Sequence, residues 1–402
     1  MNATRTLSLS TDELASFAAD LDAIGERVRE EVGEPDARYL RRIVALQRSA
    51  EIGGRALLFA GALPPLWIAG VALLGLSKIL ENMEIGHNVI HGQYDWMQDP
   101  ALNSAHYEWD IVCPAKHWKR THNYEHHTFT SIIGKDRDVG YGFLRVAEDQ
   151  PWRPWHLAQP LYALGLMFGF EWGIALHNLE LERVLAGEKP PRAMLRQSLP
   201  LARKATRQLL KDYVLFPLLG GPFAPFVFAG DAAANMVRNV WAFLIIFCGH
   251  FPSGVAYVPE SSAVPTQPET RGAWYLRQIR GSANIEGPDW FHVLSGNLSH
   301  QIEHHLFPDL PSYRYAQVAA MVEPTCRRYG IPYTSGSFVR QVGSVARRLV
   351  RLALPPAPVL SPGGLMGRSP PIGRRPIFGF FSNSSHLHRR TRRTARQSRR
   401  PT

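Results

Sequence analysis

Histidine is concentrated in three short stretches of the chain, at spacings suited to metal binding. The chain has 16 histidines, and most lie in "GHNVIHG" (86–92), "HWKRTHNYEHHT" (117–128) and "GNLSHQIEHHLFPDLP" (296–311). On a helix, the side chains of residues i and i+4 lie on one face, so two imidazoles at this spacing can bind one ion. A histidine directly after such a pair is rotated by about 100° and can therefore serve a second ion.

The spacing H-x3-H occurs once and the spacing H-x3-HH occurs twice. The eight candidate ligands are His87, His91, His122, His126, His127, His300, His304 and His305. Imidazoles packed at this density repel one another when protonated, unless an ion ligates them. The isolated histidines are better explained as surface or hydrogen-bonded residues: His106, His156, His292, His386 and His388.

The choice of metal follows from the number and type of ligands. Imidazole suits zinc, copper, iron and nickel, and eight imidazoles indicate two ions, each with an open position. The stretch "HQIEH" also matches H-x-x-E-H, the inverted zinc-peptidase motif. That interpretation leaves His305 and five other clustered histidines without a role, and Asn88 replaces the glutamate of H-E-x-x-H. A zinc peptidase or zinc-binding membrane protein therefore stays a distant alternative.

Long apolar runs are expected to position these histidines. The runs cover residues 56–80, 157–179, 213–229 and 232–251, and Lys78 is the only charge in the first. A straight helix of 25 residues spans a bilayer core, and four such runs favour a membrane protein. Pro64 and Pro65 should kink or split the first run. We expect an all-α integral membrane fold of roughly four transmembrane helices, with a cytoplasmic helical cap that holds the histidines.

Charge is distributed unevenly along the chain. The net charge is +11, but residues 355–402 carry ten arginines and no acid, which leaves about +1 for residues 1–354. No nucleic-acid partner is therefore expected. We predict an amphipathic helical segment over 1–45, the main domain over 46–345, and a basic, Pro/Arg-rich disordered tail over 346–402.

Several of these features together resemble the membrane fatty acid desaturase family. They are the three histidine stretches in this order, the ending "QIEHHLFPDLP", and the segments "HWKRTHNYEHHTFTSIIGKDRDVGYGFLR" and "PYTSGSF". The resemblance covers roughly residues 40–345. The sequence is most similar to the actinobacterial acyl-CoA desaturases of the stearoyl Δ9 type.

The resemblance implies a non-haem di-iron site whose ligands are the eight candidate histidines. His250 in "FCGHFP" is a candidate for a further ligand, and His117 and His177 are weaker candidates. Side chains expected to support the ligands without binding iron are Asp136, Asp138, Gln301 and Glu303. The resemblance predicts no catalytic residue beyond the metal centre.

The implied reaction uses O₂ and two electrons to convert a saturated acyl chain into a cis-unsaturated one. The sequence has no clustered-cysteine motif, no G-x-G-x-x-G loop and no HPGG stretch. Electrons are therefore expected from NAD(P)H through a separate reductase or electron-transfer protein. The implied substrate is a long-chain acyl-CoA, namely stearoyl- or palmitoyl-CoA. A related di-iron hydroxylase acting on alkanes or lipids is the enzymatic alternative.

The basic segment 181–211, with eight Lys/Arg and two Glu, argues for the cytoplasmic side of a membrane. We expect a multi-pass protein of the plasma membrane, in contact with lipid, with its active site facing the cytoplasm.

Overall fold

The computed structural model describes residues 9–259 and 269–356. The predicted disordered tail lies largely outside the described residues. The helices and strands are α1 (Thr11–Glu30), α2 (Glu34–Phe59), α3 (Pro64–Ile79), η1 (Leu80–His87), α4 (Asn88–Ile90), η2 (Asp95–Met97), η3 (Pro100–Leu102), α5 (Ala115–Trp118), η4 (Lys119–His126), α6 (His127–Phe129), η5 (Gly140–Gly142), η6 (Pro154–Ala158), α7 (Gln159–Phe168), α8 (Phe170–His177), α9 (Leu181–Leu185), α10 (Pro191–Leu210), η7 (Lys211–Leu215), α11 (Phe216–Leu219), η8 (Gly221–Phe223), α12 (Ala224–His250), α13 (Arg271–Arg280), β1 (Asn284–Glu286), α14 (Asp289–Leu294), α15 (Gln301–Leu306), η10 (Ser312–Arg314), α16 (Tyr315–Arg328), β2 (Ser335–Ser337) and α17 (Phe338–Ala353).

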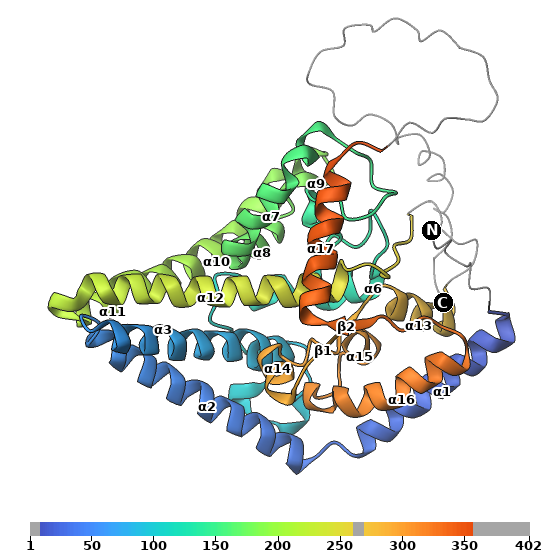
Figure 1. Cartoon of the computed structure of the whole chain (residues 1–402), viewed down its shortest axis with the longest axis horizontal. Helices are drawn as coiled ribbons and strands as arrows, with labels where there is room; N and C mark the ends of the chain where they lie inside the picture. The colour runs from blue at the N-terminus through green and yellow to red at the C-terminus, as the bar shows by residue number, and fades with distance from the viewer. Residues whose placement is uncertain (1–8, 260–268, 357–402) are drawn as a thin grey trace, which may run out of the picture.

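The described part of the chain is predominantly helical and has only two short strands, which agrees with the predicted all-α class. Figure 1 shows α2, α3 and α12 as long neighbouring helices that converge with α10 and α11 at one tip. At the opposite end, α1, α13, α15 and α16 pack together as a cap. The two short strands form a parallel pair between the long helices and the cap.

Pro64 and Pro65 split the first apolar run, as the sequence predicts. Helix α2 ends at Phe59, and α3 begins at Pro64, where a proline ring is compatible with the first helical turn. The apolar run therefore splits into two antiparallel arms. A second hairpin joins α11 to α12 through Gly220 and Gly221. The run at 157–179 divides at Gly169 into α7 and α8.

Within residues 9–259 and 269–356, two helical stretches are long and apolar enough to cross a bilayer, by length and composition. They are Pro64–Ile90, which joins α3, η1 and α4, and Gly221–His250, which contains α12. The predicted domain boundary at residue 45 falls inside α2, and α17 continues past residue 345 to Ala353.

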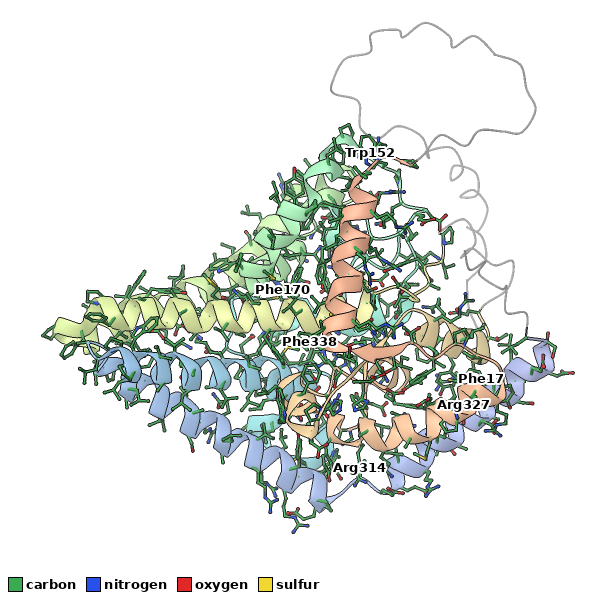
Figure 2. The ribbon with its side chains drawn as sticks, viewed as in Figure 1. Phe17, Trp152, Phe170, Arg314, Arg327 and Phe338 are labelled. Atoms are coloured by element: carbon green, nitrogen blue, oxygen red, sulfur yellow. The ribbon has the colours of Figure 1, made fainter. Side chains whose placement is uncertain are left out.

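Separate apolar clusters support the two ends of the molecule. Phe170 packs with α12, and Phe17 packs in the cap against Tyr329, with 5.2 Å between ring centroids. Figure 2 shows Phe170 near the middle of the described structure and Phe17 toward the end formed by α1 and α16. The cap core also includes Ile302 and Leu306 of the third histidine stretch, so cap packing fixes α15.

A buried charge cluster joins the long helices. Arg55 of α2 donates to Asp231 of α12 at 3.1 Å and to Asp212 of η7 at 3.4 Å. Lys78 of α3 donates to the other oxygen of Asp212 at 2.9 Å. Both carboxylates are fully buried, and charges buried this deeply are tolerated only when paired. The cluster therefore requires α2, α3, η7 and α12 to meet.

Candidate metal centre

The three histidine stretches lie on helical elements from three separate parts of the chain, and these elements meet where the long helices adjoin the cap. The first stretch lies at the end of η1 and across α4, and the second covers η4 and α6. Both η1 and η4 are π-helical, eight residues each, and end at a candidate ligand. Wide π-helical turns are rare and occur most often at functional sites. The third stretch lies on α15.

Seven histidines form two groups whose ring nitrogens converge. The first group is His87, His91, His122 and His304, and the second is His126, His250 and His305. Within each group, the candidate ligand atoms lie within 4.8 Å of one another. The neighbours His304 and His305 enter different groups, as the helical rotation predicts. His250, at the end of α12, joins the second group.

His127 lies between the two groups. Its ring centroid is 4.9 Å from that of His91, 4.8 Å from that of His304 and 4.5 Å from that of His305. Both of its ring nitrogens are buried without a hydrogen-bond partner. Eight of the nine predicted ligands, including His250, are therefore brought together.

His300 is not brought into either group. It caps the start of α15, and its ring stacks on His292 with centroids 4.6 Å apart. The positive φ angles of Gly296 and Asn297 turn the chain just before this point. Gln301 lies closer to the centre, where its amide nitrogen is 3.2 Å from Nε2 of His250.

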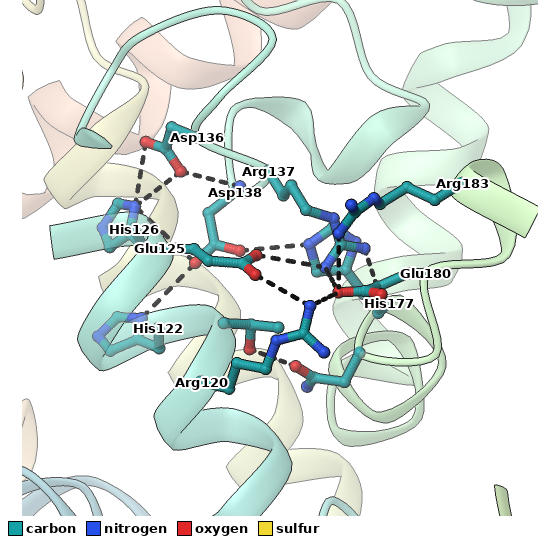
Figure 3. A network of polar contacts seen from close by, with 12 residues as sticks. Arg120, His122, Glu125, His126, Asp136, Arg137, Asp138, His177, Glu180 and Arg183 are labelled. Carbon is teal, nitrogen blue, oxygen red and sulfur yellow. Dashed lines mark hydrogen bonds and ion pairs between the residues drawn. The ribbon is translucent and has the colours of Figure 1, made fainter. Parts of the chain in front are cut away.

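The Nδ1 atoms of several ligand candidates, which point away from the two groups, contact specific side chains. Nδ1 of His126 donates to Asp136 at 3.0 Å, and Nδ1 of His122 lies 3.5 Å from Asp138 (Figure 3). Asp138 also lies 3.3 Å from Nε2 of His177. Both predicted supporting aspartates therefore lie beside ligand candidates.

Other partners of the imidazoles had no clear signal in the sequence. Nδ1 of His87 contacts Oδ1 of Asn88 at 3.0 Å, and Nδ1 of His305 contacts Oε1 of Gln278 at 3.0 Å. Tyr315 lies 3.2 Å from Nδ1 of His304. Asn88 could have been found from its place beside His87, whereas Gln278 and Tyr315 are recognisable only in three dimensions.

Glu303 does not lie beside a metal-binding nitrogen of either group. Its carboxylate accepts hydrogen bonds from Asn284 at 2.8 Å and Tyr333 at 2.7 Å, and burial raises its pKa to about 7. Its nearest histidine contact is Nδ1 of His300 at 4.0 Å. His300 and His304 also do not share a group, so the inverted zinc-peptidase arrangement is not formed.

The buried nitrogens fit a metal centre. Among the described residues, Nε2 is buried without a hydrogen-bond partner in six histidines at the centre, which are His91, His122, His126, His127, His304 and His305. The same holds for His177 and His300, which lie outside the two groups. Buried polar atoms are almost always satisfied in proteins, so unpaired imidazole nitrogens that face one another fit a set of metal ligands. Burial, together with the neighbouring imidazoles, holds the pKa of His127, His304 and His305 well below its usual range. Neutral imidazole is the form that ligates metal.

A cavity reaches the two groups from between the long helices. Its apolar lining includes Met83, Trp109, Ile111, Phe170, Ile174 and Ile246. His87, His122, His126 and His250 line the same cavity. Polar side chains such as Asn82, Glu171 and Asn239 line the rest of the cavity, so it joins an apolar part to a polar part beside the histidines.

Comparison with known proteins agrees with the geometry. The family model described as fatty acid desaturase matches residues 63–337. The chain belongs to the fatty acid desaturase family. It is thus an oxidoreductase, and the helical fold and histidine groups are those of this membrane-associated, metal-dependent family.

Individual relatives match over most of the desaturase domain. The "NADPH-dependent stearoyl-CoA 9-desaturase" of Mycobacterium tuberculosis is 45% identical over 351 residues, which cover 86% of this chain and 82% of the relative. The "sn-1 linoleoyl-lipid 6-desaturase" of Synechocystis is 29% identical over 287 residues, 69% of this chain and 77% of the relative. The "acyl-lipid (8-3)-desaturase" of Physcomitrium patens is 30% identical, over 65% of this chain and 55% of the relative.

Proposed function

We propose that this desaturase introduces a cis double bond at the Δ9 position of a long saturated acyl-CoA, stearoyl- or palmitoyl-CoA. The observation that carries the proposal is the convergence of seven histidines on two adjacent positions, with His127 between them, beside a partly apolar cavity. The name of the relative that is 45% identical supports the substrate and the position of the double bond.

We assign one iron to the group of His87, His91, His122 and His304, and a second to the group of His126, His250 and His305. When bound, iron supplies the activation of O₂ and the removal of hydrogen from an unactivated methylene, which no side-chain acid or base achieves. The protein orients the imidazoles, because a partner on Nδ1 turns Nε2 toward the ion. His127 is assigned to the space between the ions.

For His300, only the sequence pattern supports a role as an iron ligand, and we assign it to neither iron. In this proposal Asp136, Asp138 and Gln301 support the ligand imidazoles. Glu303 instead fixes the start of α15 through its bonds to Asn284 and Tyr333.

We further propose four membrane crossings, by the apolar end of α2, by α3 with η1, by η7 with α11, and by α12. Both hairpin turns lie at the tip far from the histidines, so the metal centre would face the side where the chain begins. Exposed arginines near the start of α2 and along α10 favour the cytoplasm for that side, by the distribution of positive charge in membrane proteins. The membrane would be the plasma membrane. A separate reductase would deliver electrons from NAD(P)H.

The test is product analysis with the purified, iron-loaded protein in lipid. Stearoyl-CoA and palmitoyl-CoA are supplied separately with NADPH, O₂ and a ferredoxin with its reductase, and the acyl products are analysed by mass spectrometry after derivatisation of the double bond. We expect Δ9 cis-monounsaturated products and about two irons per chain. A hydroxylated product would identify a hydroxylase, and full activity with one zinc and no iron would exclude the di-iron proposal.

A further inference from the structure

Helix α10, which leads from α9 to η7 and α11, has different side chains on its inner and outer faces (Figure 1). Leu201 and Ala205 face inward and belong to the apolar cluster that contains Trp109. Lys204, next to Ala205, is mostly buried and forms an ion pair with Glu108. The inward-facing charge of α10 is therefore neutralised within the protein.

The outer face of α10 carries a row of four arginines, which we call the arginine stripe. Its members are Arg192, Arg196, Arg203 and Arg207. At about 100° per residue, these positions fall within about 60° of one another around the helix axis. All four residues are exposed, and none of their side chains forms an ion pair or a hydrogen bond with another described residue.

The chain itself offers little negative charge to cover the arginine stripe. Residues 191–210 contain no Asp or Glu, so no acid on the helix can pair with an arginine one turn away. Outside the described ranges the sequence has one acid, Glu260, whereas residues 355–402 carry ten arginines. A negative group that pairs with the stripe is therefore expected to come from another molecule.

Exposed leucines lie directly beside the arginine stripe. Leu195 and Leu199 are each 63% exposed, and Leu209 is 41% exposed. On the helix they lie about 20–100° from Arg192, all on the same flank of the stripe. A row of arginines alone would be ordinary solvated surface. An exposed apolar row beside it is typical of a helix in a membrane interface, with leucine toward the acyl chains and arginine toward the headgroups.

The two helical hairpins place the inner end of the stripe where the protein surface changes from charged to apolar. Arg207 lies 12 residues before the end of α11, at the second hairpin turn. Arg48, an exposed residue of α2, lies 11 residues before the end of that helix, at the first turn. Between each arginine and its turn, no exposed residue is charged. Both hairpins thus become apolar at a similar depth, as expected at the boundary between headgroups and hydrocarbon.

We propose that the arginine stripe binds the phosphate groups of anionic glycerophospholipids, and that the leucines beside it contact the acyl chains of these lipids. A guanidinium group can pair with phosphate through two parallel N–H···O bonds, which an ammonium group cannot do. The distribution of the two residue types fits this role, because Lys204 and Lys211 bind acids of the protein whereas the arginines point outward. The inference concerns lipid binding and does not depend on the reaction proposed above.

The experiment measures lipid binding by the full-length, iron-loaded protein in micelles of an uncharged detergent. Dioleoylphosphatidylglycerol is titrated, and the lipids bound to each chain are counted by native mass spectrometry. Dioleoylphosphatidylcholine has the same acyl chains without net charge, and glycerol 3-phosphate, added as a competitor, has the phosphate without the chains. The test variants are Arg203→Gln/Arg207→Gln and Arg192→Gln/Arg196→Gln. The control of equal charge is Arg27→Gln/Arg327→Gln, whose side chains are 70% and 77% exposed on the cap.

We expect the unsubstituted protein to bind phosphatidylglycerol more tightly than phosphatidylcholine. Each basic side chain near an anionic surface contributes about fivefold in affinity, so each test variant should bind phosphatidylglycerol about 10–25-fold more weakly. Binding of phosphatidylcholine should be unchanged in every variant, and the control should bind phosphatidylglycerol as the unsubstituted protein does. The conservative Arg203→Lys/Arg207→Lys should keep part of the preference, because it keeps the charge but loses the paired N–H donors.

Several results would overturn the inference. One is unchanged binding of phosphatidylglycerol in both test variants, and another is an equal loss in the control. Equal binding of the two lipids by the unsubstituted protein would also overturn it and would leave the stripe as a surface for an acidic protein. Displacement of phosphatidylglycerol by an equal concentration of glycerol 3-phosphate would assign the stripe to a free phosphate compound instead. Iron content and melting temperature, measured for each variant, separate a loss of lipid binding from a loss of fold, and no step of the test requires desaturation.

Discussion

The carboxylate of Asp136 offers a sharp test of how the second histidine group is held. Its Oδ1 accepts from Nδ1 of His126 at 3.0 Å and from the backbone nitrogen of Asp138 at 3.0 Å. Its Oδ2 lies 3.1 Å from the same Nδ1 and accepts from the backbone nitrogen of Ser131 at 2.7 Å. Three N–H donors thus converge on two oxygens. Asp136→Asn replaces one oxygen with a donor, so at least one buried N–H loses its partner.

The cost can be estimated from these contacts. A buried donor left without a partner costs about 1–3 kcal/mol, and each 1.4 kcal/mol is about tenfold in an equilibrium constant. Loss of a partner that orients a metal-bound histidine typically costs about 10–100-fold in metal affinity or activity. The group of His126 has three histidines rather than four, so its ion should be the first to leave.

The assay is iron content during titration with a chelator, followed by desaturation of stearoyl-CoA. We expect Asp136→Asn to release one of two irons at about 10–100-fold lower chelator concentration and to lose activity in parallel. Asp309→Asn is the control, because that carboxylate is 56% exposed in an ion pair with Arg29. Two irons held as tightly as in the unsubstituted protein, with full activity, would refute the reasoning that Asp136 orients His126.

The remaining predictions concern ligands, packing and the tail. His305→Ala should abolish double-bond formation and lower the amount of bound iron, while the protein stays in the membrane. His300→Ala should keep its iron. Equal iron loss in the two variants would contradict the assignment of His305, but not His300, as an iron ligand. Gly54→Ala should lower the melting temperature and reduce the free energy of unfolding by about 1–3 kcal/mol. The reason is that the added Cβ would lie 2.7 Å from the backbone nitrogen of Leu74 in α3. Gly53→Ala, the control, should leave the melting temperature unchanged, because its added Cβ would meet only a methyl group of Leu73, at 3.5 Å. Deletion of residues 357–402 should leave desaturation by the membrane-inserted enzyme intact, and an inserted but inactive truncation would disprove this.

Much of the site was predictable because histidine spacing reports on helix geometry. His304 and His305 enter different groups because adjacent helical residues point in different directions. The same rule does not apply to His300, because α15 begins only at Gln301 and His300 precedes it with φ −97° and ψ 57°. The spacing H-x3-HH is the same in both stretches, so the sequence alone could not separate them.

The fold was predictable where a residue type has one local effect. Pro64 divides the first apolar run, and Gly220 lies at the second hairpin turn. The π-helical turns at η1 and η4 have no comparable signature, because they depend on tertiary contacts around the histidines. The bond between Gln278 and His305 joins residues 27 positions apart, so only the assembled fold reveals it.

The buried charge cluster has a consequence for how the protein is made. Lys78 lies in the apolar stretch Pro64–Ile90, but Asp212, which neutralises it, is synthesised 134 residues later. A lone lysine at the centre of a bilayer costs about 2.5–3.5 kcal/mol on insertion scales. While the nascent chain is still short of η7, the longer contact of Lys78 with Asp110, at 3.7 Å, is the ion pair that this charge can form among the described residues, so the first apolar stretch is less stable in lipid than in the complete protein. Chains interrupted before residue 212 should consequently be recognised as incomplete and degraded by membrane quality control, whereas completion of α12 would secure the earlier helices.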